Sequence, residues 1–118
     1  MILTIFILLG LFFSPLTVYG EEPQTYDIQV LLNSYKFVPD KLTIKVGDTI
    51  VWHNNDERQH VLASVPGSGP TEDLEIFADN FHPGTLYSHT FKEPGDYPFF
   101  CFIHNKMTGL ITVLGKEK

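Results

Sequence analysis

Apolar and polar residues alternate in several short segments of this chain, and no long stretch repeats its apolar residues with helical spacing. The alternation is clearest in residues 41–46 (KLTIKV) and 49–54 (TIVWHN). Because successive side chains of a strand point to opposite faces, each segment predicts a β-strand with one buried face. Gly47-Asp48 between them is typical of a tight turn, so we expect these two strands to pair as a hairpin.

Further strands are predicted wherever similar segments lie between turn sequences. Proline and glycine mark a loop at residues 66–70 (PGSGP) and a turn at residues 92–95 (KEPG). Residues 71–80 fit neither a helix nor a strand clearly, and we assign them no regular structure. The remaining predicted strands are residues 26–32, 60–65, 85–91, 96–101 and 108–114. Together these segments predict an all-β protein, an antiparallel β-sandwich.

The first 20 residues differ from the rest because all 8 Lys and Arg and all 14 Asp and Glu lie after them. An apolar run followed by Ser14-Pro15 and by small residues near Gly20 is typical of a secretory signal peptide, cleaved here before Glu21. The alternative is an uncleaved membrane anchor, although the apolar core is shorter than the about 20 residues that a span requires. We therefore expect a signal peptide at residues 1–20 and one domain at residues 21–118.

The composition of that domain limits which partners it can bind and how its cysteine can be used. A net charge of −6 argues against partners that are nucleic acids or anionic membranes. Ten Phe, five Tyr and one Trp supply large apolar side chains for a core that needs no disulfide. The single cysteine of an exported chain cannot form an internal disulfide, so it pairs with another molecule, stays free, or serves as a ligand or nucleophile.

That cysteine begins the segment CFIHNKM, in which Cys101, His104 and Met107 follow one another at three-residue intervals. The segment lies between two predicted strands, so a loop carries a thiol, an imidazole and a thioether. Such soft donors suit copper and are poor ligands for magnesium or calcium. Two His, one Cys and a weak axial Met are diagnostic of electron-transfer copper, which makes a second histidine the missing part.

His60 is the best candidate for that histidine, because it follows a polar loop and begins a predicted strand at one end of the sandwich. His53, on the face opposite Trp52, is interpreted as a surface residue. His82 and His89 are interpreted as solvated or hydrogen-bonded side chains.

Three segments carry a resemblance to a known family. They are YKFVPDKLTIKVGDTIVWHNND, then His60, then GTLYSHTFKEPGDYPFFCFIHNKMTGLITV. Together they resemble small type I blue-copper proteins of the plastocyanin and amicyanin group, within the cupredoxins. The resemblance implies a Greek-key antiparallel sandwich of about seven to eight strands. It also implies one copper ion bound by His60, Cys101, His104 and Met107.

Two positions depart from the pattern of that family. Val61 stands where Asn often follows the first histidine ligand, and it offers only its backbone N–H to the other ligand loop. Phe102 stands where Ser or Thr frequently follows the cysteine. Hydrogen bonding around the sulfur tunes the potential of such sites.

Two other uses of these residues fit less well. Zinc could take the same four ligands, but structural zinc uses Cys and His rather than Met. A nucleophilic Cys101 paired with His104 would need a third, orienting group, and the loop contains no acid.

The resemblance therefore implies an extracytoplasmic electron carrier, periplasmic or otherwise exported, that shuttles single electrons and is not an enzyme. Its expected partners are a donor and an acceptor redox protein, such as a cytochrome or a dehydrogenase or oxidase, and Phe102 is expected at an apolar docking rim. A monomer without nucleic acid, and without membrane insertion after signal cleavage, is expected. The alternative function is copper trafficking or buffering in the periplasm, for which the sequence lacks Met-rich or His-rich tracts. A redox enzyme of this fold would need further histidine clusters.

Overall fold

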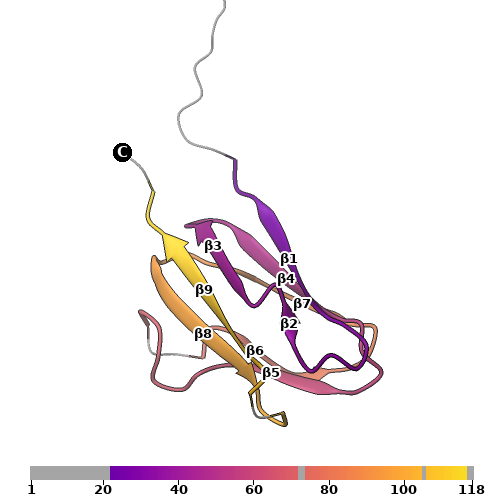
Figure 1. Ribbon diagram of the computed structural model, residues 1–118. Helices are drawn as coiled ribbons and strands as arrows, with labels where there is room; N and C mark the ends of the chain where they lie inside the picture. Colours follow the sequence, from indigo (N-terminus) through magenta and orange to yellow (C-terminus); the bar gives the residue numbers. More distant parts are fainter. Residues whose placement is uncertain (1–21, 72–73, 105, 117–118) are drawn as a thin grey trace, which may run out of the picture.

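The computed structural model describes residues 22–71, 74–104 and 106–116, and the predicted signal peptide lies outside these ranges. The described chain forms a sandwich of two β-sheets without a helix (Figure 1). One sheet has four strands, in the order β2 (Phe37–Val38), β1 (Thr25–Val30), β4 (Thr49–Asn54) and β7 (Leu86–Thr90). The other has five, in the order β3 (Lys41–Lys45), β9 (Thr108–Leu114), β8 (Gly95–Cys101), β5 (His60–Ser64) and β6 (Phe77–Phe81).

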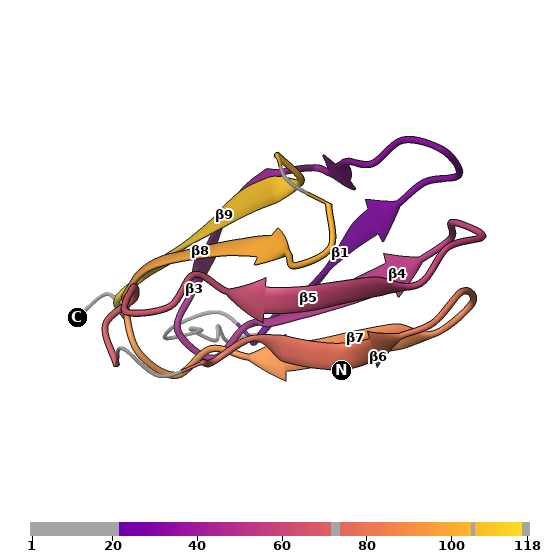
Figure 2. The same ribbon diagram turned by 90° about the horizontal axis from the view of Figure 1, so that it is seen from below.

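The core lies between the sheets and follows the alternation of the sequence. In β8, Tyr97, Phe99 and Cys101 are buried, while the residues between them are partly exposed. In β4, Trp52 points inward and meets Phe99 of the opposite sheet edge-on, with ring centroids 5.5 Å apart. Figure 2 shows the two layers whose inner faces these side chains fill. The predicted β-sandwich is therefore confirmed.

Strand pairing differs in detail from a purely antiparallel sandwich. The pairs β1–β4 and β3–β9 are parallel, and the other pairs in both sheets are antiparallel. Parallel neighbours arise because consecutive strands often cross to the other sheet before the chain returns.

The hairpin expected from residues 41–54 is wrong, because β3 and β4 belong to different sheets. The turn between them is bonded to both layers. Gly47, with a φ of 99°, donates its N–H to the Phe91 carbonyl, and Val46 donates to the Leu114 carbonyl at the end of β9. Asp48 accepts hydrogen bonds from the N–H groups of Gln24 and Lys45. These contacts direct the chain across the sandwich rather than back along the same sheet.

Strand β6 begins in the segment, residues 71–80, to which the sequence assigned no regular structure. It is an edge strand that pairs only with β5 in its sheet, and Phe81 is its one buried residue. A strand with one buried side chain carries little alternation, so its sequence pattern is weak.

Several connections meet at one end of the sandwich. The β4–β5 loop is bonded to the β1–β2 loop, because Asn55 donates its N–H to the Val30 carbonyl and Asn33 donates its N–H to Asp56. The side-chain amide of Asn54, the last residue of β4, donates to the carbonyl of Arg58 in the β4–β5 loop and to the carbonyl of Phe81 at the end of β6. Hydrogen bonds therefore link these segments at the end of the molecule where β5 begins and β8 ends. No helix long and apolar enough to cross a membrane occurs in the described ranges.

Candidate metal centre

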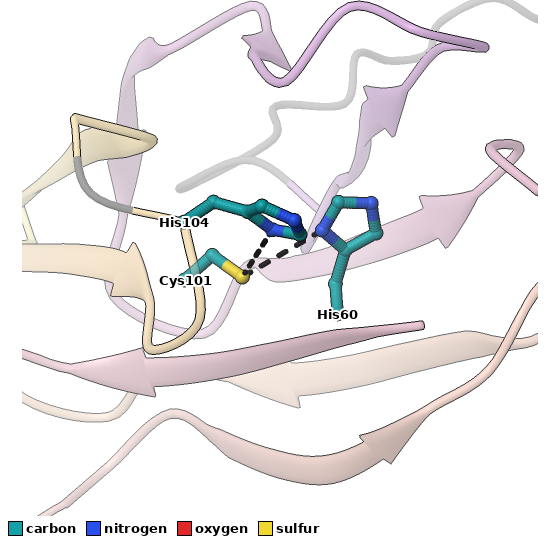
Figure 3. A group of neighbouring side chains, drawn as sticks. All are labelled: His60, Cys101 and His104. Atoms are coloured by element: carbon teal, nitrogen blue, oxygen red, sulfur yellow. Dashed lines mark hydrogen bonds between the residues drawn. The ribbon is translucent and has the colours of Figure 1, made fainter. Parts of the chain in front are cut away.

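Three side chains that could bind a metal converge at this end. His60 begins β5, Cys101 ends β8, and His104 lies on the loop between β8 and β9; their potential ligand atoms are all within 4.8 Å of one another. Figure 3 shows both imidazoles directed toward the sulfur. The Cys101 Sγ lies 3.6 Å from His60 Nδ1 and 3.4 Å from His104 Nδ1. Both histidines thus present Nδ1 to the thiol.

Backbone hydrogen bonds explain why the β8–β9 loop gathers its side chains. His104 donates its N–H to the Cys101 carbonyl, and Met107 donates to the His104 carbonyl. The Cys101 N–H then donates to the Met107 carbonyl at 3.0 Å and closes the loop. Two successive backbone hydrogen bonds between residues three apart, together with this closing bond, bring the backbones of Cys101 and Met107 together.

Met107 is buried beside this loop, with 1 % of its surface exposed. It belongs to the hydrophobic core together with Cys101. The backbone bonds to Cys101 and His104 hold Met107 at the base of the loop, so its thioether lies among apolar side chains rather than in solvent.

Strand pairing brings His60 to the same place. Leu62 of β5 lies opposite Cys101 of β8, and the Phe102 N–H donates to the Val61 carbonyl at 2.9 Å. The register of β5 against β6 shifts between His60 and Leu62, which marks a bulge at the start of the strand. The Val61 N–H in turn donates to the Cys101 sulfur at 3.5 Å, so the backbone group expected at this position does link the two ligand segments.

These surroundings favour a thiolate at Cys101. Burial alone raises the pKa of the thiol, but hydrogen bonds from His60, Val61, His104 and Ile103 outweigh burial and lower the pKa to about 6. The pKa of His60 is raised, because hydrogen bonding to Cys101 and to Asp56 outweighs the opposing effect of burial. Since the thiolate is the form of cysteine that binds a metal, the cluster is prepared for a cation.

Asp56 is a residue of this site that the sequence interpretation missed. Its Oδ2 lies 3.0 Å from His60 Nε2, and its side chain is completely buried. Burial raises the pKa of this carboxyl, but hydrogen bonds from His60, Asn33 and Glu57 more than compensate, so the pKa is lowered overall. The one signal in the sequence was an acid four residues before His60 in a loop that was interpreted only as polar.

The other three histidines lie outside the cluster. His53 is hydrogen-bonded to Asp27 at 2.7 Å, and His89 to Glu75 at 2.8 Å, while His82 is exposed. Their interpretation as hydrogen-bonded or solvated side chains agrees with these contacts.

The donor set determines which metal fits. Two imidazole nitrogens and a thiolate sulfur surround one point, and a thioether is buried in the same loop. Carboxylate oxygens, which magnesium and calcium require, are not among the clustered ligand atoms of the described residues. A set with this softness fits copper.

Comparison with known proteins supports the same conclusion. Residues 24–114 match the family of copper binding proteins described as the plastocyanin/azurin family. The chain belongs to this family. It is a type I blue-copper cupredoxin and a copper electron-transfer protein, and its cofactor is copper.

Individual relatives show how far the cupredoxin similarity extends. A plastocyanin of Nostoc punctiforme is 35% identical, over 97% of this chain and 90% of the relative. Amicyanin-alpha of Methylorubrum extorquens is 27% identical, over 79% of this chain and 76% of the relative. A solved structure of an oxidised amicyanin mutant aligns with a TM-score of 0.65 and 27% identity, covering 75% of this chain and 80% of that one. The predicted family and cofactor are confirmed.

Proposed function

We propose that this cupredoxin carries single electrons between redox proteins outside the cytoplasm, using one copper ion held by His60, Cys101, His104 and Met107. The observation that carries the proposal is the convergence of the Cys101 sulfur and two Nδ1 atoms at one buried point. A copper ion bound there supplies one-electron exchange between Cu(II) and Cu(I).

The chain's own residues make that exchange fast by limiting rearrangement. His60 and Cys101 are buried and hydrogen-bonded, so they would move little when a copper ion held between them changes its oxidation state. The Val61 N–H stabilises negative charge on the sulfur. Met107, buried at the base of the loop, would supply a weak thioether ligand to the ion.

His104 is the proposed port for electrons. It is half-buried, whereas His60 and Cys101 are fully buried. Its ring packs edge-on against Tyr35, with centroids 4.9 Å apart. Beside it, Phe102 and Ile103 are 55% and 56% exposed and form an apolar rim. A small apolar surface of this kind suits brief encounters with a donor and an acceptor, such as a cytochrome or a dehydrogenase or oxidase.

The proposal includes export. The uncharged residues 1–20 act as a signal peptide, and residues 21–118 form the mature, monomeric domain, without nucleic acid or membrane insertion. The plastocyanin and amicyanin relatives support a place outside the cytoplasm. N-terminal sequencing of the exported protein should begin at Glu21, and a retained Met1 would contradict cleavage.

Copper trafficking or buffering is the second candidate, and it differs in requiring metal that exchanges readily. The burial of two of the three clustered side chains favours retention of copper and therefore electron transfer. A chelator added to the copper-loaded protein distinguishes the two functions. An electron carrier keeps its copper over many redox cycles, whereas a copper buffer releases copper to the chelator.

The deciding experiment adds one equivalent of Cu(II) to the purified domain and records the visible and EPR spectra. An intense thiolate-to-copper band with narrow copper hyperfine splitting is expected. Stopped-flow mixing of the reduced protein with an oxidised c-type cytochrome should then show electron exchange. A colourless product, or a blue protein that exchanges no electrons with any small redox protein or chemical oxidant, would contradict the carrier function.

A further inference from the structure

A buried carboxylate stands directly behind His60. Asp56 lies on the β4–β5 loop, and both of its oxygens are engaged. Oδ1 accepts hydrogen bonds from the N–H groups of Asn33 at 3.2 Å and Glu57 at 2.7 Å, and Oδ2 is 3.0 Å from His60 Nε2. Backbone donors from two loops therefore fix the carboxylate against the imidazole.

This contact determines which nitrogen of His60 is free. A carboxylate only accepts hydrogen bonds, so the proton of the ring must lie on Nε2. When the ring is neutral, as a metal ligand must be, Nδ1 keeps its lone pair for the metal, and this nitrogen faces the Cys101 sulfur at 3.6 Å. A partner on the remote nitrogen also restricts rotation of a ligating ring and increases its basicity.

The charge of Asp56 acts on the same site. Its side chain has no exposed surface, so solvent screens it far less than it screens an exposed acid. The oxidised site carries one positive charge more than the reduced site. A fixed negative charge separated from the metal by one imidazole ring therefore stabilises the oxidised state more than the reduced state.

Arg58 offsets this effect only in part. Its Nη1 lies 3.6 Å from Asp56 Oδ1 and donates to the Asn33 side chain at 2.8 Å. The guanidinium also lies over the Tyr35 ring, 5.1 Å from its centroid. However, the Arg58 side chain is 45% exposed, so its field is screened by water and salt. The buried acid acts on the metal through direct contact with a ligand, and the cation does not.

We infer that Asp56 is a positioning residue that fixes the metal-binding tautomer of His60 and lowers the reduction potential of the bound copper. The inference rests on the proposed ligand set and function.

The test compares the reduction potentials of the wild type, Asp56→Asn and Asp48→Asn. Asparagine keeps the volume of aspartate, removes its charge and places an amide where a carboxylate oxygen met His60. Asp56→Asn should shift the reduction equilibrium toward Cu(I) at least tenfold, which is about 59 mV for one electron. Its hyperfine splitting should also change.

Asp48→Asn is the matched control. Asp48 is also buried and also accepts two backbone N–H groups, but it lies at the other end of β4. Asp48→Asn should lower the free energy of unfolding and leave the reduction potential of the copper unchanged. Arg58→Gln should shift the equilibrium toward Cu(II), by less than the Asp56 variant shifts it toward Cu(I).

A blue Asp56→Asn protein whose equilibrium lies within twofold of the wild type would overturn the inference and leave the proposed function intact. A wild type without a type I spectrum would instead overturn the proposed function. If Asp56→Asn does not fold, Asp56→Ser gives the same comparison. Nitrogen-15 NMR of the diamagnetic Cu(I) wild type is an independent readout: His60 should carry a slowly exchanging proton on Nε2, and a proton on Nδ1 would refute the tautomer.

Discussion

At the scale of single residues, Cys101 owes its proposed role to neighbours that come from other parts of the chain. His60 and Val61 approach its sulfur from β5, and His104 approaches from the following loop. Spacing in the sequence predicted Cys101, His104 and Met107 as ligands, because three-residue intervals on a short loop can return the chain to the same point. It could not identify Asp56, since that contact depends on how the β1–β2 and β4–β5 loops pack against each other.

Replacing the thiol provides the sharpest test of the ligand set. Cys101→Ser should abolish the intense visible band, because the band requires a copper–thiolate bond. His53→Ala is the matched control: His53 bonds Asp27 on an outer face and should be dispensable for colour. Absorption spectra after addition of one equivalent of Cu(II) measure both. A blue Cys101→Ser protein, or a colourless His53→Ala protein, would show that the assigned ligands are wrong.

Tyr97 makes the fold sensitive to alkali. Its buried hydroxyl donates to the Glu93 carbonyl at 2.6 Å, and burial, together with the charges of Glu75 and Glu93, raises its pKa. In the unfolded chain, the tyrosine hydroxyl releases its proton at about pH 10. The stabilisation that the protonated Tyr97 hydroxyl gives the folded state is therefore complete below that pH. It is lost as pH rises through the higher pKa of Tyr97 in the folded state.

Tyr97→Phe should remove part of this alkaline loss. At pH 7 the variant should be less stable by about 1 kcal/mol, because it lacks one hydrogen bond. Urea denaturation at several values between pH 8 and pH 11 should show a shallower decline than in the wild type. Parallel declines in the two proteins would mean that Tyr97 is not the group responsible.

At the scale of elements, alternation identified most strands but not their neighbours. Alternation with a period of two residues indicates which face of a strand is buried. It says nothing about which strand lies beside it. The wrong hairpin illustrates this limit: the Gly47-Asp48 turn was recognised, but its bonds to Phe91, Leu114 and Gln24 arise only in the folded sandwich. Strand β6 escaped notice because an edge strand with one buried side chain needs little alternation.

Close packing at β9 allows no side chain at Gly109. A Cβ there would collide with the Phe99 ring and with the Asp40 carbonyl oxygen. Gly109→Ala should therefore destabilise the fold by about 2 kcal/mol or more. At Gly115, a Cβ would meet nothing within 4 Å, so Gly115→Ala should change stability by less than about 0.5 kcal/mol. Thermal unfolding compares the two, and equal effects would contradict this account of β9.

At the scale of the whole molecule, the proposed ligands tie β5 to the β8–β9 loop. These segments are far apart in the unfolded chain, so a bound metal stabilises the folded state alone. At a free copper concentration about 100 times the dissociation constant, the gain is about 2.7 kcal/mol. For a domain of this size, that gain raises the unfolding temperature by about 10 °C or more.

Calorimetry with and without one equivalent of copper measures this shift. Cys101→Ser is the control, and copper should leave its unfolding temperature nearly unchanged. A wild type that copper fails to stabilise would show that the ion binds elsewhere or equally well to the unfolded chain.

The unequal exposure of the two clustered histidines has a consequence for the order in which redox partners bind the proposed carrier. Only His104 approaches the surface among the three clustered side chains, and the exposed Phe102 and Ile103 lie beside it. Donor and acceptor must then occupy the same patch in turn, never together. Each turnover requires the carrier to leave one redox protein before it binds the other. A large excess of acceptor should therefore compete with the donor for the patch and slow electron transfer from donor to acceptor.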